Sequence, residues 1–294
     1  MRPFVDRPIT DIAAASNLAV EAAAHWELSE PVLLRSGMNA IYRSGSVVLR
    51  ISEPSAPASA SLKLAERLLE AGLRVTRPVR TDTFGSAGLH ATAWEHINAT
   101  GGPIDWCAVG AMVRTVHALD ANDLPSEYPL PLPVDFPWWD FDTLLAQIGG
   151  ELDDEARRGI EQAVERWPDW ANPAGAVVCH GDVHPGNVIM SADGPVLIDW
   201  DLMCLAPPGW DHAPLMTLAE QWGGEPGVYE AYADGYGASL RTQPTAEAFA
   251  ELRLVAATLM RVRAGMRNDA AMPEAQRRLA HWRGESDAPA WQAQ

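Results

Sequence analysis

Three polar residues in the second half of the chain have the types and spacing of a phosphoryl-transfer site. Asp182 is followed after four residues by Asn187, and Asp199 stands at the end of the next apolar run. A carboxylate can orient an attacking hydroxyl and accept its proton, while carboxylate and amide oxygens can hold Mg²⁺ against a triphosphate. We therefore expect Asp182 to be the catalytic base and Asn187 and Asp199 to be metal ligands.

Short apolar runs bracket this polar segment and predict how it is positioned. Residues 177–179 and 188–190 are rich in β-branched side chains, which indicates two buried strands joined by a loop. Residues 191–195 are typical of a hairpin turn, so the following strand delivers Asp199 to the same place. With His180 ahead of Asp182, the order His-x-Asp-x4-Asn and a later Asp matches the catalytic loop of kinases.

Two other interpretations of this segment stay open. It could be a polar β-turn whose Asp and Asn side chains bond only to their own backbone. Alternatively, His180, Asp182 and His184 alternate along the chain and could offer two imidazoles and a carboxylate to zinc. Such alternation shares one face only on a strand, whereas Pro185-Gly186 indicates a turn. We therefore interpret His180 and His184 as supporting loop residues.

Length and composition limit the classes of protein to consider. A chain of 294 residues suits one bilobal domain or two small ones. No apolar run approaches the roughly 20 residues of a membrane span, and the N-terminus lacks the apolar core of a signal peptide. The three cysteines are an odd number without a CxxC pair, which favours reduced packing residues over disulfides. We expect a cytoplasmic protein without a membrane partner.

The net charge of −17 belongs entirely to the part of the chain after residue 97. Residues 1–97 hold 10 acidic and 10 basic side chains, so they are neutral overall. An acidic surface repels nucleic acid and anionic membranes, which argues against both as partners. The charge could attract a cationic substrate, although solubility explains most of it equally simply.

The first third of the chain predicts an antiparallel sheet with two helices. The helical period marks residues 11–28 and 62–69, and β-type runs cover 31–35, 40–43, 46–51, 74–79 and 89–97. Thr10 or Asp11 is the expected cap of the first helix. Arg50 ends the third run, where a guanidinium could clamp phosphate. Glu66 could pair with Arg50, but a solvent-facing position is the stronger expectation.

Beyond residue 97 the pattern is mostly helical. Helices are expected over residues 106–119, 144–148, 155–167, 226–240, 245–268 and 273–283, and over a further segment capped by Asp211 that runs to Trp222. The Gly-rich stretch after residue 97 marks a lobe boundary, so we expect lobes at residues 1–97 and 98–294. We interpret the stripe formed by Tyr229, Tyr232 and Tyr236 as core. Trp138, Trp139 and Trp222 could instead stack on a cation or sugar.

These motifs together resemble the aminoglycoside phosphotransferase family, a group of small-molecule kinases with the protein-kinase-like fold. The resemblance rests on the segments 178–189 and 197–201, the Trp210-Asp211 turn and the strand around Arg50. It implies an α+β bilobal fold with an antiparallel-sheet N-terminal lobe and a mostly helical C-terminal lobe.

The resemblance also implies roles for individual residues. Asp182 would be the catalytic base, Asn187 and Asp199 the Mg²⁺ ligands, and Arg50 a phosphate contact. The nucleotide would lie against a hinge formed by Trp94, Glu95, His96 and Ile97. Asp201 belongs to the matching segment as a supporting residue, and Asp211 would support the catalytic loop.

One departure from the family pattern concerns the helix after the third strand. The family usually places a Glu early on this helix, whereas Ser61 stands there in this chain and Glu66 comes about one turn later. The acidic partner of Arg50 is therefore open at this stage.

We expect an O-phosphotransferase that requires Mg²⁺ and uses ATP or GTP to phosphorylate a hydroxyl of a small molecule. The acceptor could be aminoglycoside-like, an amino alcohol, a sugar or a macrolide, because members of the family use all of these. The alternative is a pseudokinase-like module that binds nucleotide and has little activity.

Overall fold

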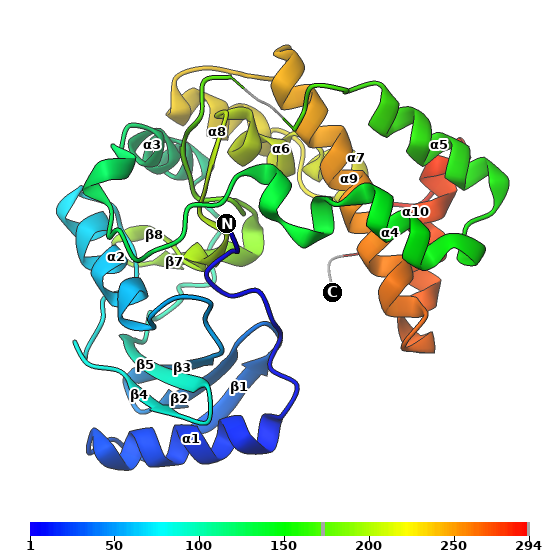
Figure 1. Cartoon of the computed structure of the whole chain (residues 1–294). Helices are drawn as coiled ribbons and strands as arrows, with labels where there is room; N and C mark the ends of the chain where they lie inside the picture. Colours follow the sequence, from blue (N-terminus) through cyan, green and yellow to red (C-terminus); the bar gives the residue numbers. More distant parts are fainter. Residues whose placement is uncertain (172–173, 293–294) are drawn as a thin grey trace.

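The computed structural model describes residues 1–171 and 174–292, and it has a sheet-containing part and a helical part (Figure 1). The sheet is antiparallel with the order β1-β2-β3-β5-β4. Its strands are β1 (Val32–Ser36), β2 (Ala40–Ser44), β3 (Val47–Ser52), β4 (Phe84–Ser86) and β5 (Leu89–Glu95). The meander expected from the turn residues is therefore confirmed, with β5 inserted beside β3.

Helix α1 (Ile12–His25) covers one face of this sheet (Figure 1). Its N-terminus is capped by Asp11, whose side chain accepts a hydrogen bond from the backbone N–H of Ala14 at 2.9 Å. Leu18 on the helix and Leu49 and Ile51 on β3 belong to one buried cluster. Because the sheet buries one face against α1, β3 can turn the alternate side chain Arg50 toward the other lobe.

Helix α2 (Ser59–Glu70) belongs to a different hydrophobic core from α1 and the sheet face that α1 covers. Its apolar side chains Leu64 and Leu68 belong to the large core that extends through the helical part, as does Phe4 near the N-terminus. The ring of Phe4 stacks on Tyr128 with 4.8 Å between centroids. The two parts of the molecule are thus joined by apolar packing as well as by the chain.

The helical part is built around the long helix α9 (Pro244–Gly265), which packs against α4, α5, α6 and α10 (Figure 1). The other helices are α3 (Trp106–His117), α4 (Phe141–Ile148), α5 (Asp154–Glu165), α6 (Gly209–Met216), α7 (Leu218–Trp222), α8 (Val228–Tyr236) and α10 (Met272–Trp282). Among the described residues, no helix is both long enough and apolar enough to cross a membrane.

Two small strand pairs lie where the two parts meet. Strand β6 (Val177–Cys179) pairs with β9 (Cys204–Ala206), and β7 (Val188–Ser191) forms a hairpin with β8 (Gly194–Leu197). The loop from β6 to β7 carries Asp182 and Asn187, and Asp199 follows β8. The expected loop between strands and the expected hairpin are both present.

Three local expectations were wrong. Residues 74–79 form no strand and make only single bridges, from Val75 to Leu197 and from Pro78 to Trp94, because proline removes a ladder donor. The helix expected up to Trp222 is divided at Thr217 into α6 and α7. Asp211 lies inside the first turn of α6, and its side chain bonds to the loop after β6 instead of capping its own helix.

Candidate active site

The strand pair β6–β9 fixes the backbone that leads into Asp182. Cys179 on β6 lies opposite Cys204 on β9 in the strand register, and this brings Leu202 against Gly181. Gly181 has a φ of +93°, and a Cβ at this position would collide with the carbonyl oxygen of Leu202. Only glycine fits this close approach without strain, so the turn that presents Asp182 depends on it.

Asp182 is held by two side chains of its own loop and by one from the distant helix α9. Its Oδ2 atom lies 3.1 Å from Nδ2 of Asn187 and 3.3 Å from Nε2 of His184, and its Oδ1 atom accepts a hydrogen bond from Nη2 of Arg253. Burial opposes the charged form of Asp182, but the positive charge of Arg253 and the bond to His184 outweigh burial and hold its pKa well below the usual range. Asp182 is therefore ionised at neutral pH and can accept a bond from a hydroxyl.

Asn187 and Asp199 have oxygen atoms that are suited to a hard cation. Nδ2 of Asn187 donates to the backbone oxygen of Asp182 at 2.9 Å, and no donor among the described residues contacts the amide Oδ1. Asp199 has left-handed backbone angles, and Arg35 lies 3.6 Å from its Oδ2 atom. Burial and the nearby charge of Asp201 raise the pKa of Asp199 to about 6. A bound cation would relieve this accumulation of negative charge.

The acidic partner of Arg50 is Asp201 and not a residue of α2. Nη2 of Arg50 lies 2.6 Å from both carboxylate oxygens of Asp201, although the two residues are 151 positions apart. Asn39 donates to Oδ2 of Asp201 at 3.0 Å and completes the group. Glu66 is exposed, as expected, while Ser61 is buried. The ion pair that the family pattern builds within the N-terminal lobe is here made across the two lobes.

Two cavities meet at the catalytic loop. A cavity of about 440 Å³ is lined by Arg50, by Asp199 and by all four expected hinge residues, Trp94, Glu95, His96 and Ile97. A second cavity of about 240 Å³ is lined by Asp182, Arg253 and aromatic side chains. Arg50 and Asp199 therefore face one space and the expected base faces another, while Asn187 is in the lining of neither cavity.

The hinge residues differ in the backbone groups they leave available. The N–H of Glu95 donates to the oxygen of Arg77 at 2.9 Å, and the N–H of His96 donates to the oxygen of Ser46 at 3.0 Å. Neither the N–H nor the oxygen of Ile97 has a backbone partner among the described residues. Ile97 is thus the hinge residue with a free donor and a free acceptor.

The geometry is against a zinc site at the two loop histidines. His180 is fully buried, with Nε2 bonded to the oxygen of Ile198 at 3.1 Å and Nδ1 accepting from the N–H of Asp182 at 3.3 Å. Burial lowers the pKa of His180, which favours the neutral form that these two bonds need. Nδ1 of His184 accepts from the N–H of Gly186. Both histidines thus bond to backbone groups, and their supporting role stays a prediction.

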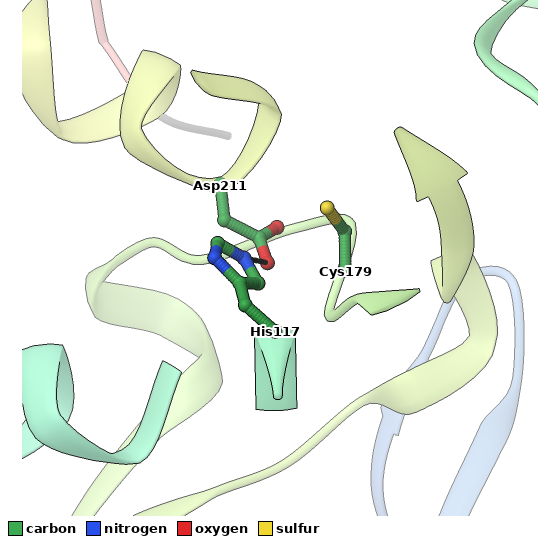
Figure 2. Close-up of side chains that lie close together, drawn as sticks. All are labelled: His117, Cys179 and Asp211. Atoms are coloured by element: carbon green, nitrogen blue, oxygen red, sulfur yellow. Dashed lines mark hydrogen bonds and ion pairs between the residues drawn. The ribbon is translucent and has the colours of Figure 1, made fainter. Parts of the chain in front are cut away.

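Asp211 anchors the catalytic loop through the backbone. Its two oxygens accept bonds of 2.8 Å from the N–H groups of His180 and Gly181, and it is fully buried. The same carboxylate lies 3.0 Å from Nε2 of His117, and Figure 2 shows this pair with Cys179 beside it. The supporting position of Asp211 is as the resemblance implied, although that role itself stays a proposal.

His117 has a role in the site that the sequence analysis missed. Its Nδ1 atom lies 3.0 Å from the hydroxyl of Tyr236, so both ring nitrogens have partners. Burial disfavours its charge, but the hydrogen bond with Asp211 and the neighbouring Cys179 outweigh burial and raise the pKa to about 10. The available signal was a histidine that continues the apolar stripe of Val109 and Val113 at a spacing of four residues.

The group formed by His117, Cys179 and Asp211 is the one cluster of metal-ligating types that the described part of the chain brings together. The oxygens of Asp211 and the nitrogens of His117 are already occupied by protein groups. Burial raises the pKa of the Cys179 thiol, so the group is not the thiolate that zinc requires. We assign the cluster to the support of the catalytic loop.

Replacing His117 by phenylalanine is expected to destabilise the protein by about 3–5 kcal/mol at pH 6.5, because one partner of a buried ion pair is lost. The pKa of His117 is higher in the folded protein than its ordinary value of 6.5. Its stabilising effect is therefore complete below about pH 6.5 and declines as the pH rises toward 10. Denaturant unfolding at several pH values measures this as a difference between wild type and variant.

The exposed His25 provides a matched control, since its side chain is 51% exposed. His25→Phe should change the free energy of unfolding by less than about 1 kcal/mol at each pH. A wild-type-to-His117→Phe difference that stays constant from pH 6.5 to 10 would contradict the assigned charge.

The aromatic residues divide into core and cavity groups. Tyr229 and Tyr232 are buried, and Tyr236 packs at 5.4 Å on His117, so the stripe is core as expected. Trp222 packs on Trp291 and on the guanidinium of Arg278, away from both cavities. Trp138 and Trp139 line the second cavity together with Phe136 and Trp210, and these four are the aromatic residues placed to meet a ligand there.

Known structures with similar folds include phosphotransferases and a kinase in complex with nucleotides. Amicoumacin kinase in complex with AMP-PNP has a TM-score of 0.70 and 13% identity, covering 95% of this chain and 96% of its own. The GDP complex of aminoglycoside 2'-phosphotransferase-IIIa has a TM-score of 0.68 and 13% identity, covering 94% and 99%. Spectinomycin phosphotransferase with ADP and spectinomycin has a TM-score of 0.63 and 16% identity, covering 89% and 94%. At these identities the similarity shows the fold.

No curated protein matches the sequence. The family comparison does give a match, to the profile described as "Phosphotransferase enzyme family", over residues 39–255. This range contains Arg50, the catalytic loop, Asp199 and Asp211, and it is well over half of the chain. Together with the bilobal kinase-like architecture, the match shows that the chain belongs to the phosphotransferase enzyme family.

Proposed function

We propose that this protein transfers the γ-phosphoryl group of ATP or GTP to a hydroxyl of a small molecule and requires Mg²⁺. The observation that carries the proposal is the placement of the two cavities on either side of the catalytic loop, one lined by Arg50 and Asp199 and the other by Asp182. A triphosphate in the first cavity and a hydroxyl in the second would meet at this loop.

The larger cavity has the size and lining of a nucleotide site. Its volume of about 440 Å³ lies in the usual range for small-ligand sites, and Val48, Ile189 and Ile198 give it apolar walls. The free N–H and oxygen of Ile97 can bond to the edge of a purine base. Arg50 lines the same cavity and, being pre-oriented by Asp201, can contact the phosphates.

Asn187 and Asp199 would hold Mg²⁺. The free amide oxygen of Asn187 and the carboxylate of Asp199 are both hard oxygen donors, and the raised pKa of Asp199 shows that its charge lacks full compensation. The metal would supply charge neutralisation at the phosphates when bound. Arg35, 3.6 Å from Asp199, would have to leave this carboxylate or share it.

The transfer itself would need positioning and one proton acceptor. Asp182 orients the acceptor hydroxyl, whose oxygen attacks the γ-phosphorus while the bond to the bridging β,γ-oxygen breaks. The hydroxyl proton passes to Asp182. The backbone bonds from His180 and Gly181 to Asp211 keep Asp182 in place, which favours the reaction by preorganisation.

The same arrangement supports the proposed lobe boundary at residues 97/98. Residues 1–97 contain the five-stranded sheet, and residues 98–294 contain the catalytic loop, so the nucleotide would bind between the two lobes. A cytoplasmic location, where nucleotide and Mg²⁺ are abundant, fits this proposal and stays a prediction.

Replacing Asp199 by asparagine tests the metal and nucleotide assignment. We expect nucleotide affinity measured by calorimetry with Mg²⁺ to fall at least tenfold, while affinity in EDTA stays within about twofold, because only the metal-dependent part is removed. In the wild type, Mg²⁺-nucleotide affinity should decline as the pH falls below about 6, where Asp199 becomes protonated. Equal titrations of wild type and variant with Mg²⁺ would exclude Asp199 as a ligand.

The nucleotide-free Asp199→Asn variant should also be more stable than the wild type. The folded-state pKa of Asp199 is higher than its ordinary value of 3.8, so the ionised side chain disfavours the folded state at neutral pH. Its side chain is 31% exposed, so water screens the effect, and the gain should be on the order of 1 kcal/mol. General damage to the fold would lower the stability. A gain in stability together with weaker Mg²⁺-nucleotide binding therefore indicates loss of a metal ligand.

Phosphate transfer itself is tested by ADP formation over a set of hydroxyl compounds with Mg²⁺-ATP. Transfer to at least one acceptor at a rate that depends on Asp182 would support the proposed function. Nucleotide binding without transfer to any compound would instead favour the pseudokinase-like alternative.

A further inference from the structure

The cavity beside Asp182 has a mostly apolar lining with two charged residues. Its walls are aromatic or aliphatic: Phe136, Trp138, Trp139, Leu202, Trp210, Ala256, Ala257 and Met260. Asp182 and Arg253 are the charged residues of the lining, and they contact each other. A site for a polycation needs several carboxylates, but apart from Asp182 this lining has none. The acidic excess of the chain therefore does not reach the acceptor cavity.

Arg253 has unused hydrogen-bond donors in this cavity. Its Nη2 atom contacts Oδ1 of Asp182, and no acceptor among the residues described in the structure contacts its Nε or Nη1 atoms. The side chain is 24% exposed. A guanidinium has five N–H donors in a planar fork that matches a carboxylate. The remaining donors of Arg253 can therefore bind an anionic group of a ligand.

Arg263, near the end of the same helix, lies beside a residue of this cavity. Nη2 of Arg263 lies 3.1 Å from Sδ of Met260, which lines the cavity, and Nη1 lies 3.4 Å from Oε1 of Gln147. Within residues 1–171 and 174–292, no carboxylate forms an ion pair with Arg263. Arg263 thus adds a positive charge beside Met260, outside the lining itself, which disfavours a cationic acceptor.

The volume of the cavity limits the size of the part of the acceptor that it encloses. About 240 Å³ is more than the roughly 150 Å³ that accommodates a benzene ring, and less than the roughly 300–1,000 Å³ of sites for drug-sized ligands. One ring with a short side chain fits this space. The four aromatic side chains offer such a ring stacked or edge-on contacts.

We propose that the acceptor is a small hydroxyl compound with an apolar ring and one carboxylate, and that Arg253 binds the carboxylate. This assignment rests on the proposed function, since it names the substrate class of the same site. Because Arg253 touches Asp182, a hydroxyl one or two carbon atoms from the bound carboxylate would lie next to the base. The positive guanidinium would also lie between the carboxylate of Asp182 and the carboxylate of the acceptor.

A matched set of three probes tests the charge preference without requiring turnover. 3-Phenyllactate, 1-phenylpropan-2-ol and 1-amino-3-phenylpropan-2-ol have the same ring and hydroxyl and differ in charge. Tryptophan fluorescence reports binding, because Trp138 and Trp139 line the cavity. With nucleotide and Mg²⁺ present, we expect the acid to bind at least tenfold more tightly than the amine.

Three variants of the full chain assign this preference to Arg253. Arg253→Met should bring the acid and the amine to within about threefold of each other, and Arg253→Lys should retain part of the preference. Arg267→Met is the matched control, because Arg267 is exposed and does not line the cavity. An acid that binds no better than the amine, including no binding of either, would overturn the inference. So would a full preference in folded Arg253→Met.

Phosphate transfer measured on the same probes separates this inference from the proposed function. Preferential, Arg253-dependent binding of the acid without phosphate transfer to any hydroxyl compound would remove the proposed function and leave the ligand class in place. Transfer to a cationic acceptor without any preference for the acid would instead support the proposed function and remove the inferred ligand class.

Discussion

Replacing Asp182 by asparagine is expected to lower kcat by about 10³-fold while nucleotide affinity stays within about twofold. A general base typically contributes between about 10²- and 10⁴-fold to the rate. Asp182 lines the smaller cavity and not the nucleotide cavity, so the variant should still bind Mg²⁺-nucleotide. Steady-state ADP formation gives kcat, and calorimetry gives the nucleotide affinity.

Asparagine is the preferred replacement because its amide oxygen can still accept a bond from Arg253 and keep the loop in place. The control is Asp193→Asn, since Asp193 is exposed in the turn between β7 and β8. The control should keep wild-type kcat and affinity. Wild-type turnover in Asp182→Asn would show that another group accepts the proton.

Replacing Asp201 by alanine is expected to destabilise the protein by about 3–5 kcal/mol and to weaken nucleotide binding at least tenfold. The side chains of Arg50 and Asp201 are 15% and 7% exposed, so the change leaves a buried cation without its main partner. Burial lowers the pKa of Arg50, but the charges of Asp201 and Asp199 outweigh burial and raise it. Arg50 would also lose the orientation that directs it into the nucleotide cavity.

A surface ion pair gives the scale for this effect. Arg7 and Glu53 are 62% and 45% exposed and 3.5 Å apart, so Glu53→Ala should cost less than about 1 kcal/mol. Chemical denaturation of both variants measures the two values. An effect of Asp201→Ala as small as that of the surface pair would show that the contact across the lobes does not stabilise the fold.

Ser61 offers a test of why this chain lacks the usual acidic residue on α2. Ser61 and Arg50 line the same cavity, so a glutamate at position 61 could reach the guanidinium. Ser61→Glu should destabilise the wild type, where Asp201 already occupies Arg50, and should restore part of the stability of Asp201→Ala. We expect a coupling free energy of at least about 1 kcal/mol, and strict additivity would contradict this exchange of partners.

Much of the catalytic loop could be predicted from the sequence because its parts are neighbours along the chain. Asp182 and Asn187 are five residues apart, and a tight turn brings them within 3.1 Å of each other. Asp199 follows one hairpin later. The helix and strand periods likewise predicted β1, β2, β3, β5 and most helices. They missed β4, and they wrongly predicted a strand at the proline-containing residues 74–79 and an unbroken helix across Thr217.

The sequence by itself therefore predicted a phosphotransferase and the candidate residues Asp182, Asn187 and Asp199, since local backbone geometry is enough to assemble a loop and a hairpin. Only the tertiary structure decided the partners of those residues. Asp201 holds Arg50 across 151 positions, Arg253 reaches Asp182 across 71, and His117 supports Asp211 across 94. Such contacts depend on how whole helices and strands pack, which no short spacing encodes. The proposed acceptor cavity is built from residues between 136 and 260, so its lining could be identified only from the packing of these distant segments.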